Sequence, residues 1–338
     1  MIPQIIILVI FLLMSNSNYA EDAATFQGVC SQRGQVALAA QTGKEGWLFL
    51  TGDFHFLGCD EFWGEKAARV SKASKPEWAD PLPVIVNFQE QLSKAGVELW
   101  LVPVPPKPAI YADKVLEHLS ETPPRFDTSL QNFYTELKKN GVKVIDLSDE
   151  FLASRKTPTT LQPLYCMTDS HWSPWACELV AQRIKKELGE HDWLPKAGSS
   201  IFSVKSIPLE VIGDLLAIVP EAPVKKETLA ARLITEKETV DSNSPILLMG
   251  DSHCLVFHAG EDLHGTQGGL VDQLAFELNM PIDLLGVRGS GATATRVNLL
   301  QRIKDDAKYL GGKKVIIWCF AAREFTESQG WRKVPILK

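Results

Sequence analysis

The sequence has no excess of basic residues. Its 35 Lys and Arg are outnumbered by 41 Asp and Glu, which gives a formal net charge of −6. Binding to nucleic acid needs clustered Lys and Arg that neutralise phosphates, so this composition argues against DNA or RNA as a partner. There is no internal repeat and no low-complexity block, and 338 residues with 45% hydrophobic content can bury a large core. We therefore expect a soluble globular fold.

The chain also lacks a C-x-x-C pair, and the spacing of its six cysteines does not resemble a structural zinc site. In an exported protein an even number of cysteines permits disulfides. Cys30–Cys59 and Cys166–Cys177 are the pairs to test, although sequence alone does not fix the pairing. Cys254 and Cys319 lie in apolar, strand-like surroundings and are more simply interpreted as core residues.

No Lys or Arg precedes the apolar run IPQIIILVIFLLM near the N-terminus, residues 2–14. This run has the length of a signal-peptide core and is shorter than the ~20 residues that cross a bilayer as a helix. The polar stretch SNSNYA then leads to a cleavage position after Ala20, although Asn18 is not the small residue usual there. We interpret residues 1–20 as a signal peptide or a short uncleaved anchor, with a buried N-terminal element as the alternative. Residues 21–338 are expected to form one domain.

Helical and strand-like patterns alternate along the rest of the chain. Helices are expected at 83–96, 130–141, 173–189, 269–279 and 296–312, and strands at 97–106, 142–151, 245–250, 281–287 and 313–322. Ser173 is the expected N-cap of the third helix, with Pro174 at its first position. This order predicts an α/β fold in which helices cover both faces of a mostly parallel sheet.

Two short motifs carry candidate chemistry. In GDSH, residues 250–253, a buried strand ends and Gly250 permits a sharp turn that exposes the Ser252 hydroxyl. In TDSH, residues 168–171, the D-x-H spacing on an extended segment puts Asp169 and His171 on the same side. Ser252 as nucleophile, His171 as general base and Asp169 as the residue that orients His171 would form a triad. The alternative for Ser252 or Asp251 is a simple helix cap.

A metal site is a rival interpretation, because D-x-H followed later by G-D also begins some metallophosphoesterases. No G-N-H occurs, however, and the other histidines show no i, i+4 pair of the kind found in zinc hydrolases. We predict neither a metal nor another cofactor. A non-catalytic polysaccharide-binding protein is a rival of another class, with Trp47, Trp172, Trp175 and Trp318 stacking on sugar rings instead of packing in the core.

Four stretches together resemble a known family. GKEGWLFLTGD, TDSHWSPWA, LLMGDSHCLVF and VIIWCFAAREF are similar to the SGNH-hydrolase-like domain of the AlgJ/AlgX alginate O-acetyltransferases, over roughly Cys30 to Thr326. Ordinary SGNH esterases place the serine first and the histidine motif last, so the motif order resembles a permuted arrangement. The resemblance implies a three-layer sandwich.

The resemblance also implies a function. A family member transfers acetyl groups in the periplasm, through an acetyl-serine, onto hydroxyls of alginate or a related exopolysaccharide. A membrane-bound O-acyltransferase at the inner membrane is the implied partner that supplies the acetyl group. By position, Ser252, His171 and Asp169 match the family triad, and Arg323 matches an arginine after the tryptophan-containing strand. The chain ends at Lys338, so no appended carbohydrate-binding module is expected.

A tetrahedral acyl intermediate needs hydrogen-bond donors for its oxyanion. We expect the Ser252 backbone N–H and the Arg323 side chain to supply them, the alternative for Arg323 being a surface ion pair with Glu324 or Glu327. Glycines 268, 269, 289 and 291 lie in segments that could approach the site, and Gly269 is the predicted contributor. Trp172, with Trp175 as a second candidate, is expected to wall the site against water. The triad alone does not separate a transferase from a secreted acetylesterase.

Overall fold

The core of the protein is a five-stranded parallel sheet. The computed structural model describes residues 21–119, 125–155, 162–196, 198–219, 221–222 and 226–337. The strand order is β4-β3-β9-β7-β8, and every neighbouring pair is parallel. The strands are β3 (Glu98–Val104), β4 (Lys143–Val144), β7 (Ile246–Gly250), β8 (Asp283–Gly286) and β9 (Val315–Ala321). This confirms the predicted α/β class.

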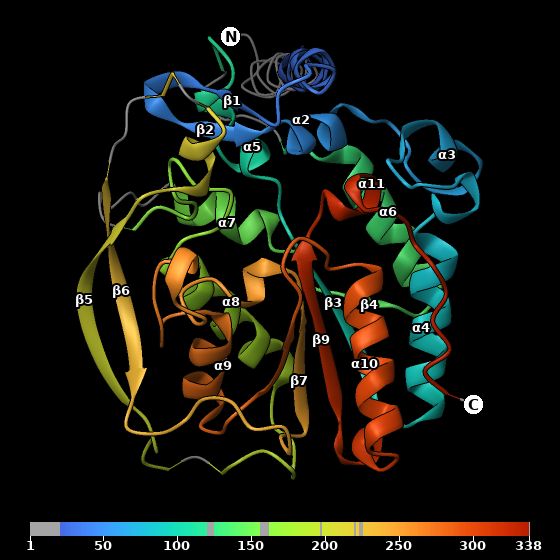
Figure 1. Ribbon diagram of the computed structural model, residues 1–338, viewed down its shortest axis with the longest axis vertical. Helices are drawn as coiled ribbons and strands as arrows, with labels where there is room; N and C mark the ends of the chain where they lie inside the picture. The colour runs from blue at the N-terminus through green and yellow to red at the C-terminus, as the bar shows by residue number, and fades with distance from the viewer. Residues whose placement is uncertain are drawn as a thin grey trace, which may run out of the picture.

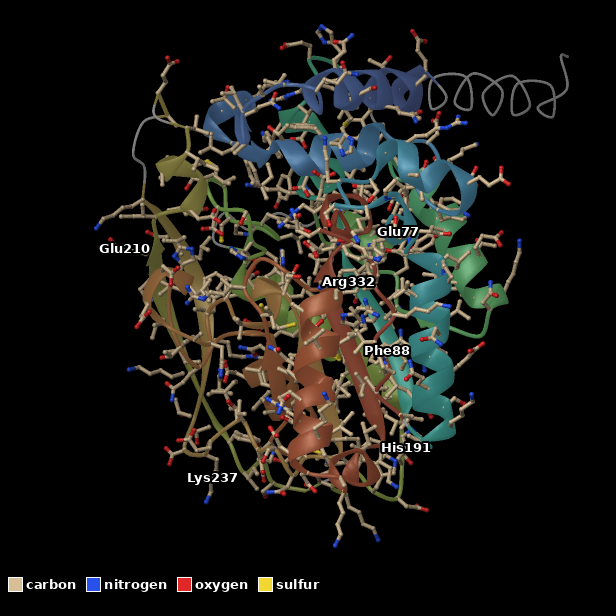
Figure 2. The ribbon with its side chains drawn as sticks, turned by 45° about the vertical axis from the view of Figure 1, so that its right-hand side comes forward. Glu77, Phe88, His191, Glu210, Lys237 and Arg332 are labelled. Atoms are coloured by element: carbon tan, nitrogen blue, oxygen red, sulfur yellow. The ribbon has the colours of Figure 1, made fainter. Side chains whose placement is uncertain are left out.

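Helices cover both faces of the sheet. Figure 1 shows α4 (Leu82–Lys94) and α10 (Thr293–Asp305) on one side, and α8 (Pro174–Leu188) and α9 (Leu270–Leu278) on the other. Phe88 of α4, labelled in Figure 2, meets the Trp318 ring of β9 edge-on with centroids 5.2 Å apart. Because strand side chains alternate between faces, Trp318 packs on the α4 side and Cys319 faces the α8 side.

The predicted strand at 142–151 is much shorter in the structure. After β4 the Asp146 carboxylate accepts a hydrogen bond from the Ser148 backbone N–H at 3.1 Å. Such an Asx turn diverts the chain out of the sheet, and α7 (Ser148–Arg155) begins there. The preceding helix, α6 (Thr128–Lys139), agrees with the predicted helix within two residues.

Two hairpins that the sequence patterns did not predict flank the sheet. β1 (Ala40–Thr42) and β2 (Leu48–Leu50) pair above the carboxyl ends of the strands, followed by α2 (Thr51–Gly58). The short helices α3 (Ala67–Val70), α5 (Lys107–Ile110) and α11 (Glu324–Glu327) lie in the same upper part of Figure 1. The second hairpin, β5 (Ser203–Val211) with β6 (Glu227–Thr235), runs along the side of the molecule.

All six cysteines are buried free thiols, so neither Cys30–Cys59 nor Cys166–Cys177 is bonded in this structure. In the part of the chain that the structure describes, no helix combines the length and apolar character needed to cross a membrane. The predicted signal segment, residues 1–20, lies outside the described residues.

Candidate active site

Ser252 stands on a tight turn at the carboxyl end of β7. All five residues of β7 are buried, and a Cβ on Gly250 would lie 1.5 Å from the Cys319 carbonyl oxygen, so only glycine fits there. A single turn, η6 (Ser252–Cys254), follows, with Asp251 as its N-cap. Ser252 remains partly exposed at the carboxyl edge of the sheet, as the sequence predicted.

Asp169 and His171 come from the segment that enters α8. Ser173 caps this helix by accepting a hydrogen bond from the Ala176 N–H, and Pro174 is its first residue, as expected. His171 Nδ1 lies 2.7 Å from Asp169 Oδ1, and His171 Nε2 lies 2.7 Å from Ser252 Oγ. Residues 81 positions apart in the sequence thus meet at one edge of the sheet.

The tautomer of His171 follows from its partners. Burial acts to raise the pKa of the Asp169 carboxyl, but hydrogen bonds and charge from His171 and His264 hold this pKa well below its usual value. Asp169 is therefore a carboxylate, which can only accept, so His171 Nδ1 carries the proton. In neutral His171 the Nε2 lone pair then faces Ser252 and accepts a hydrogen bond from its hydroxyl group.

Asp169 accepts more hydrogen bonds than the triad requires. Its Oδ1 also accepts from the His171 backbone N–H at 2.9 Å. Its Oδ2 accepts from the Asp214 backbone N–H at 2.8 Å and lies 2.7 Å from His264 Nε2. Asp214 opens the turn η5 (Asp214–Ala217), and its own Oδ2 accepts from Ser170 Oγ at 2.6 Å. Sequence reasoning missed both Asp214 and His264, because each is an isolated polar residue in a segment without periodicity.

A buried lysine anchors the segment that bears Asp169. Lys107 Nζ donates to the carbonyl oxygens of Leu48, Met167 and Asp169 at 2.6, 3.0 and 2.9 Å. The side chain is only 2% exposed, and burial lowers the pKa of Lys107 to about 8 although nearby acidic groups oppose this. Lys107 therefore ties β2 to the candidate site, a contact that no sequence motif indicated.

A close contact between two stretches of backbone fixes the Asp169 segment on its other side. A Cβ on Gly213 would lie 2.0 Å from the Thr168 carbonyl oxygen, so the η5 turn can reach Asp169 only with glycine at this position. On β6, the Glu227 carboxylate accepts from the backbone N–H groups of Met167 and Thr168 at 2.8 and 3.2 Å. The edge hairpin thereby contributes to the position of the Asp169 loop.

Arg323 follows β9 and forms an ion pair that the sequence did not predict. Its Nη1 lies 3.3 Å from Oδ1 of the buried Asp53 on α2, rather than from Glu324 or Glu327. Burial acts to lower the pKa of Arg323, but the charges of Asp53 and Asp251 raise it above its usual value. The Ala321 N–H donates to Asp251 Oδ2 at 2.8 Å, which fastens the end of β9 to the serine turn. Arg323 thus lies two residues beyond a direct contact with that turn.

Two predicted contributors do not occupy the expected positions. Trp172 is fully buried, with its ring against His253 at a centroid distance of 5.3 Å, so it cannot stack on a sugar ring. The Gly269 N–H donates to Asp272 Oδ2 at 3.0 Å at the start of α9, so it is already engaged and not aimed at an oxyanion. Trp175 is partly buried and donates from Nε1 to Ser154 Oγ at 3.4 Å. Trp318 is also fully buried, in agreement with core packing.

One group of ligand atoms could hold a metal ion among the residues that the structure describes. Asp169, His171 and Asp214 each offer one atom, and these atoms lie within 4.8 Å of one another. Several of these oxygens and nitrogens already hydrogen bond within the protein, including the 2.7 Å contact between Asp169 and His171. The alternative interpretation, a metal site, therefore has a specific location in the structure. Adding a chelator tests it.

The fold and the residues at the carboxyl edge of the sheet define the class of the protein. A parallel sheet with a serine on a tight turn and a D-x-H segment beside it is the arrangement of an SGNH-hydrolase-like α/β domain. The chain belongs to the family described as "SGNH hydrolase-like domain, acetyltransferase AlgX", whose model matches residues 40–322. The predicted family resemblance is thereby confirmed.

Individual relatives agree with this assignment. The chain is 28% identical over 225 residues to the probable alginate O-acetylase AlgJ of Pseudomonas aeruginosa, a match that covers 66% of this chain and 50% of that protein. The O-acetyltransferase domain of Pseudomonas putida AlgJ superposes with a TM-score of 0.61 at 18% identity, covering 85% and 92% of the two chains. Pseudomonas aeruginosa AlgX gives a TM-score of 0.59 at 16% identity, covering 88% and 66%. The chain spans about half the length of the first of these curated relatives.

Proposed function

We propose that this chain is an O-acetyltransferase that moves an acetyl group through an acetyl-Ser252 intermediate onto hydroxyls of an exported polysaccharide. The observation that carries the proposal is the line of contacts from Asp169 through His171 to Ser252, at 2.7 Å and 2.7 Å, within a domain of an acetyltransferase family. A positioned base and an orienting carboxylate are what a serine nucleophile requires.

The proposed reaction has two halves. Ser252 Oγ attacks the carbonyl carbon of an acetyl ester or thioester while His171 Nε2 takes the hydroxyl proton. The tetrahedral intermediate expels the donor's leaving group, which receives that proton, and leaves acetyl-Ser252. An acceptor hydroxyl then gives its proton to His171 and attacks the acetyl carbon. Collapse releases the acetylated acceptor and returns the proton to Ser252.

The oxyanion donors proposed here are the Ser252 backbone N–H and Arg323. The hydrogen bond to Asp53 comes from one nitrogen of the guanidinium group, Nη1, at 3.3 Å. A guanidinium group carries five N–H donors, so others remain to face a developing oxyanion. The pairing with Asp53 would fix the orientation of the group before substrate arrives.

The proposal also includes the acceptor, the cellular location and the acetyl donor. Three curated relatives are named as probable alginate O-acetylases, which supports alginate or a related exopolysaccharide as acceptor. An exported polymer implies a periplasmic location, with residues 1–20 as signal peptide or inner-membrane anchor and residues 21–338 as a single domain. A membrane-bound O-acyltransferase is the proposed source of the acetyl group.

Transfer and hydrolysis differ in what attacks acetyl-Ser252. The test is to incubate the protein with an acetyl ester and candidate oligosaccharides and to weigh the sugars by mass spectrometry. A mass gain of one acetyl group per sugar that is absent with Ser252→Ala supports the transferase. Release of acetate alone, with loss of acetyl groups from a pre-acetylated polymer, supports an acetylesterase instead. Turnover that survives Ser252→Ala but stops with a chelator would support the metal site.

A further inference from the structure

Asp169 is contacted by two imidazoles, one on each carboxylate oxygen. His171 Nδ1 lies 2.7 Å from Oδ1, and His264 Nε2 lies 2.7 Å from Oδ2. A triad needs only the first of these contacts, because one oxygen suffices to orient the base. The second imidazole is therefore an addition that the proposed reaction does not by itself explain.

The loop that carries His264 adopts an unusual backbone to reach Asp169. Four non-glycine residues between 257 and 267 have positive φ: Phe257 (61°), Glu261 (52°), His264 (70°) and Gln267 (64°). Such conformations cost free energy in L-residues and persist only where the surroundings enforce them. The loop closes on itself through Phe257 N–H to Leu263 O at 2.8 Å and Gly268 N–H to Phe257 O at 2.9 Å. A tightly closed, strained loop thus presents His264 at a fixed position.

The surroundings of His264 favour its protonated form. The side chain is 9% exposed, and its ring lies against Phe257 with centroids 5.9 Å apart. Asp169, Asp214 and Glu227 are the acidic groups that face it, from the α8 entry segment, η5 and β6. Burial alone would lower the pKa of His264, but the hydrogen bond and charge of Asp169, with the other two acids, raise it. Within the same loop the charge of Asp262 is met by Arg288 at 2.8 Å.

A charge on His264 bears directly on His171. Asp169 strengthens His171 as a base because its negative charge stabilises the imidazolium that forms when His171 takes a proton. A protonated His264 on the other oxygen neutralises part of that charge. We propose that His264 is a positioning residue of the active site, which holds the second oxygen of Asp169 and, when protonated, moderates the basicity of His171. This inference rests on the proposed function of Ser252.

The distinguishing experiment is a pH profile of Ser252 acylation. Wild type, His264→Gln and His264→Ala are mixed with a chromogenic acetyl ester between pH 5 and 9, and acetyl-serine is read by intact mass. Glutamine keeps a nitrogen donor near the position of Nε2 but removes the charge. We expect the midpoint of the His264→Gln profile to move up by about one pH unit, the usual size of an effect of one nearby charge. We expect His264→Ala also to give a lower maximum rate of Ser252 acylation.

A matched control lies in the same loop. His258 Nδ1 contacts Asp272 Oδ1 at 3.0 Å, so it also forms a His–Asp pair, but its aspartate lies in the first turn of α9 and is not Asp169. His258→Gln should leave the midpoint unchanged. If His264→Gln has the wild-type midpoint and merely reacts more slowly, its role is structural and the inference is wrong.

A second measurement does not depend on activity. In Ser252→Ala protein with isotope-labelled histidine, the His264 ring should titrate above the ordinary value of about 6.5. Titration at or below that value overturns the inference. If wild type never acylates at Ser252, the proposed function fails, whereas normal acylation with an unchanged His264→Gln profile defeats only the role of His264.

Discussion

The sequence contains the tripeptide Asp-Ser-His twice, at 169–171 and at 251–253, and the two copies fold alike but face different surroundings. In each copy the aspartate Oδ1 accepts from the backbone N–H of the histidine at 2.9 Å. The same oxygen lies 2.7 Å from Nδ1 of the histidine in the first copy and 3.0 Å in the second. Three residues are enough to close this turn. They do not decide which side chain is presented for chemistry.

The difference lies in what surrounds each copy. The first presents its histidine to Ser252, while its own serine is bound to Asp214 at 2.6 Å. The second presents its serine, while His253 is 1% exposed between His171 and Trp172. Burial lowers the pKa of His253 although Asp251 opposes this, so His253 is neutral near pH 7. In the proposed reaction the same local turn therefore supplies the base from the first copy and the nucleophile from the second.

The largest expected difference in activity is between substitutions of the two serines. Ser252→Ala should reduce acetyl transfer on the order of 10⁶-fold, as loss of a serine nucleophile does in comparable triads, because Ser252 is the proposed site of the acyl intermediate. Ser170→Ala removes the matching hydroxyl of the other copy and should cost no more than about tenfold, through Asp214. Steady-state rates with a chromogenic acetyl ester measure both. Equal losses in the two variants would mean that the copies have been assigned the wrong roles.

The two histidines give the next comparison. Asparagine can replace the Nδ1–H donor of a histidine but has no equivalent of the Nε2 lone pair. His171→Asn should therefore lose activity nearly as completely as the serine variant, since the base is gone. His253→Asn should keep most activity and instead lose about 1–3 kcal/mol of folding stability, because its ring packs against Trp172. Urea melts alongside rates test this; an inactive but fully stable His253→Asn protein contradicts it.

Arg323 tests the electrostatic difference between the two Asp-Ser-His copies, because its charge lies beside the second copy. If it binds the oxyanion, Arg323→Ala should lower kcat about 100- to 1000-fold with little change in KM. Asp53→Asn, which leaves the guanidinium group in place but removes its buried partner, should have a smaller effect in the same direction. A loss of less than about tenfold in Arg323→Ala would remove it from the site.

The smallest effect concerns Glu324, which is buried beside the second copy. Burial, and then the charge of Asp251, raise the pKa of Glu324 to about 7. An acid whose folded pKa exceeds its unfolded value of about 4.5 stabilises the fold while protonated, and this contribution is lost as pH rises from about 4.5 through 7. Glu324→Gln should flatten that decline, gaining about 2 kcal/mol relative to wild type between pH 5 and 8.

Denaturant unfolding at several pH values measures the effect on Glu324. Glu136→Gln, at an exposed ion pair with Lys139, is the control and should leave the pH slope unchanged. An identical pH slope in wild type and Glu324→Gln would show that Glu324 is ionised on both sides of this range.

Much of the fold could be predicted because its periodicity is local. The continuous apolar run of β7 and the helical spacing of α4 reflect burial that each element needs wherever it lies. The β5–β6 hairpin was not predicted, because most of β5 is exposed and gives no clear alternation of buried and exposed residues. Trp172 was expected to wall the site because it follows His171 in the sequence, but packing in the folded protein buries its ring completely.

The sequence by itself determined the local parts of the candidate site: the glycine turn that exposes Ser252, the D-x-H spacing and the cap that begins α8. These depend on residues within a few positions of one another, whose geometry the backbone dictates. Only the tertiary structure decided that Lys107 anchors the Asp169 segment, that Asp53 pairs with Arg323 and that His264 shares Asp169 with His171. Each of these contacts joins residues more than 60 positions apart. Such pairs leave no pattern in a single sequence, because burial and charge select a partner only after the chain has folded.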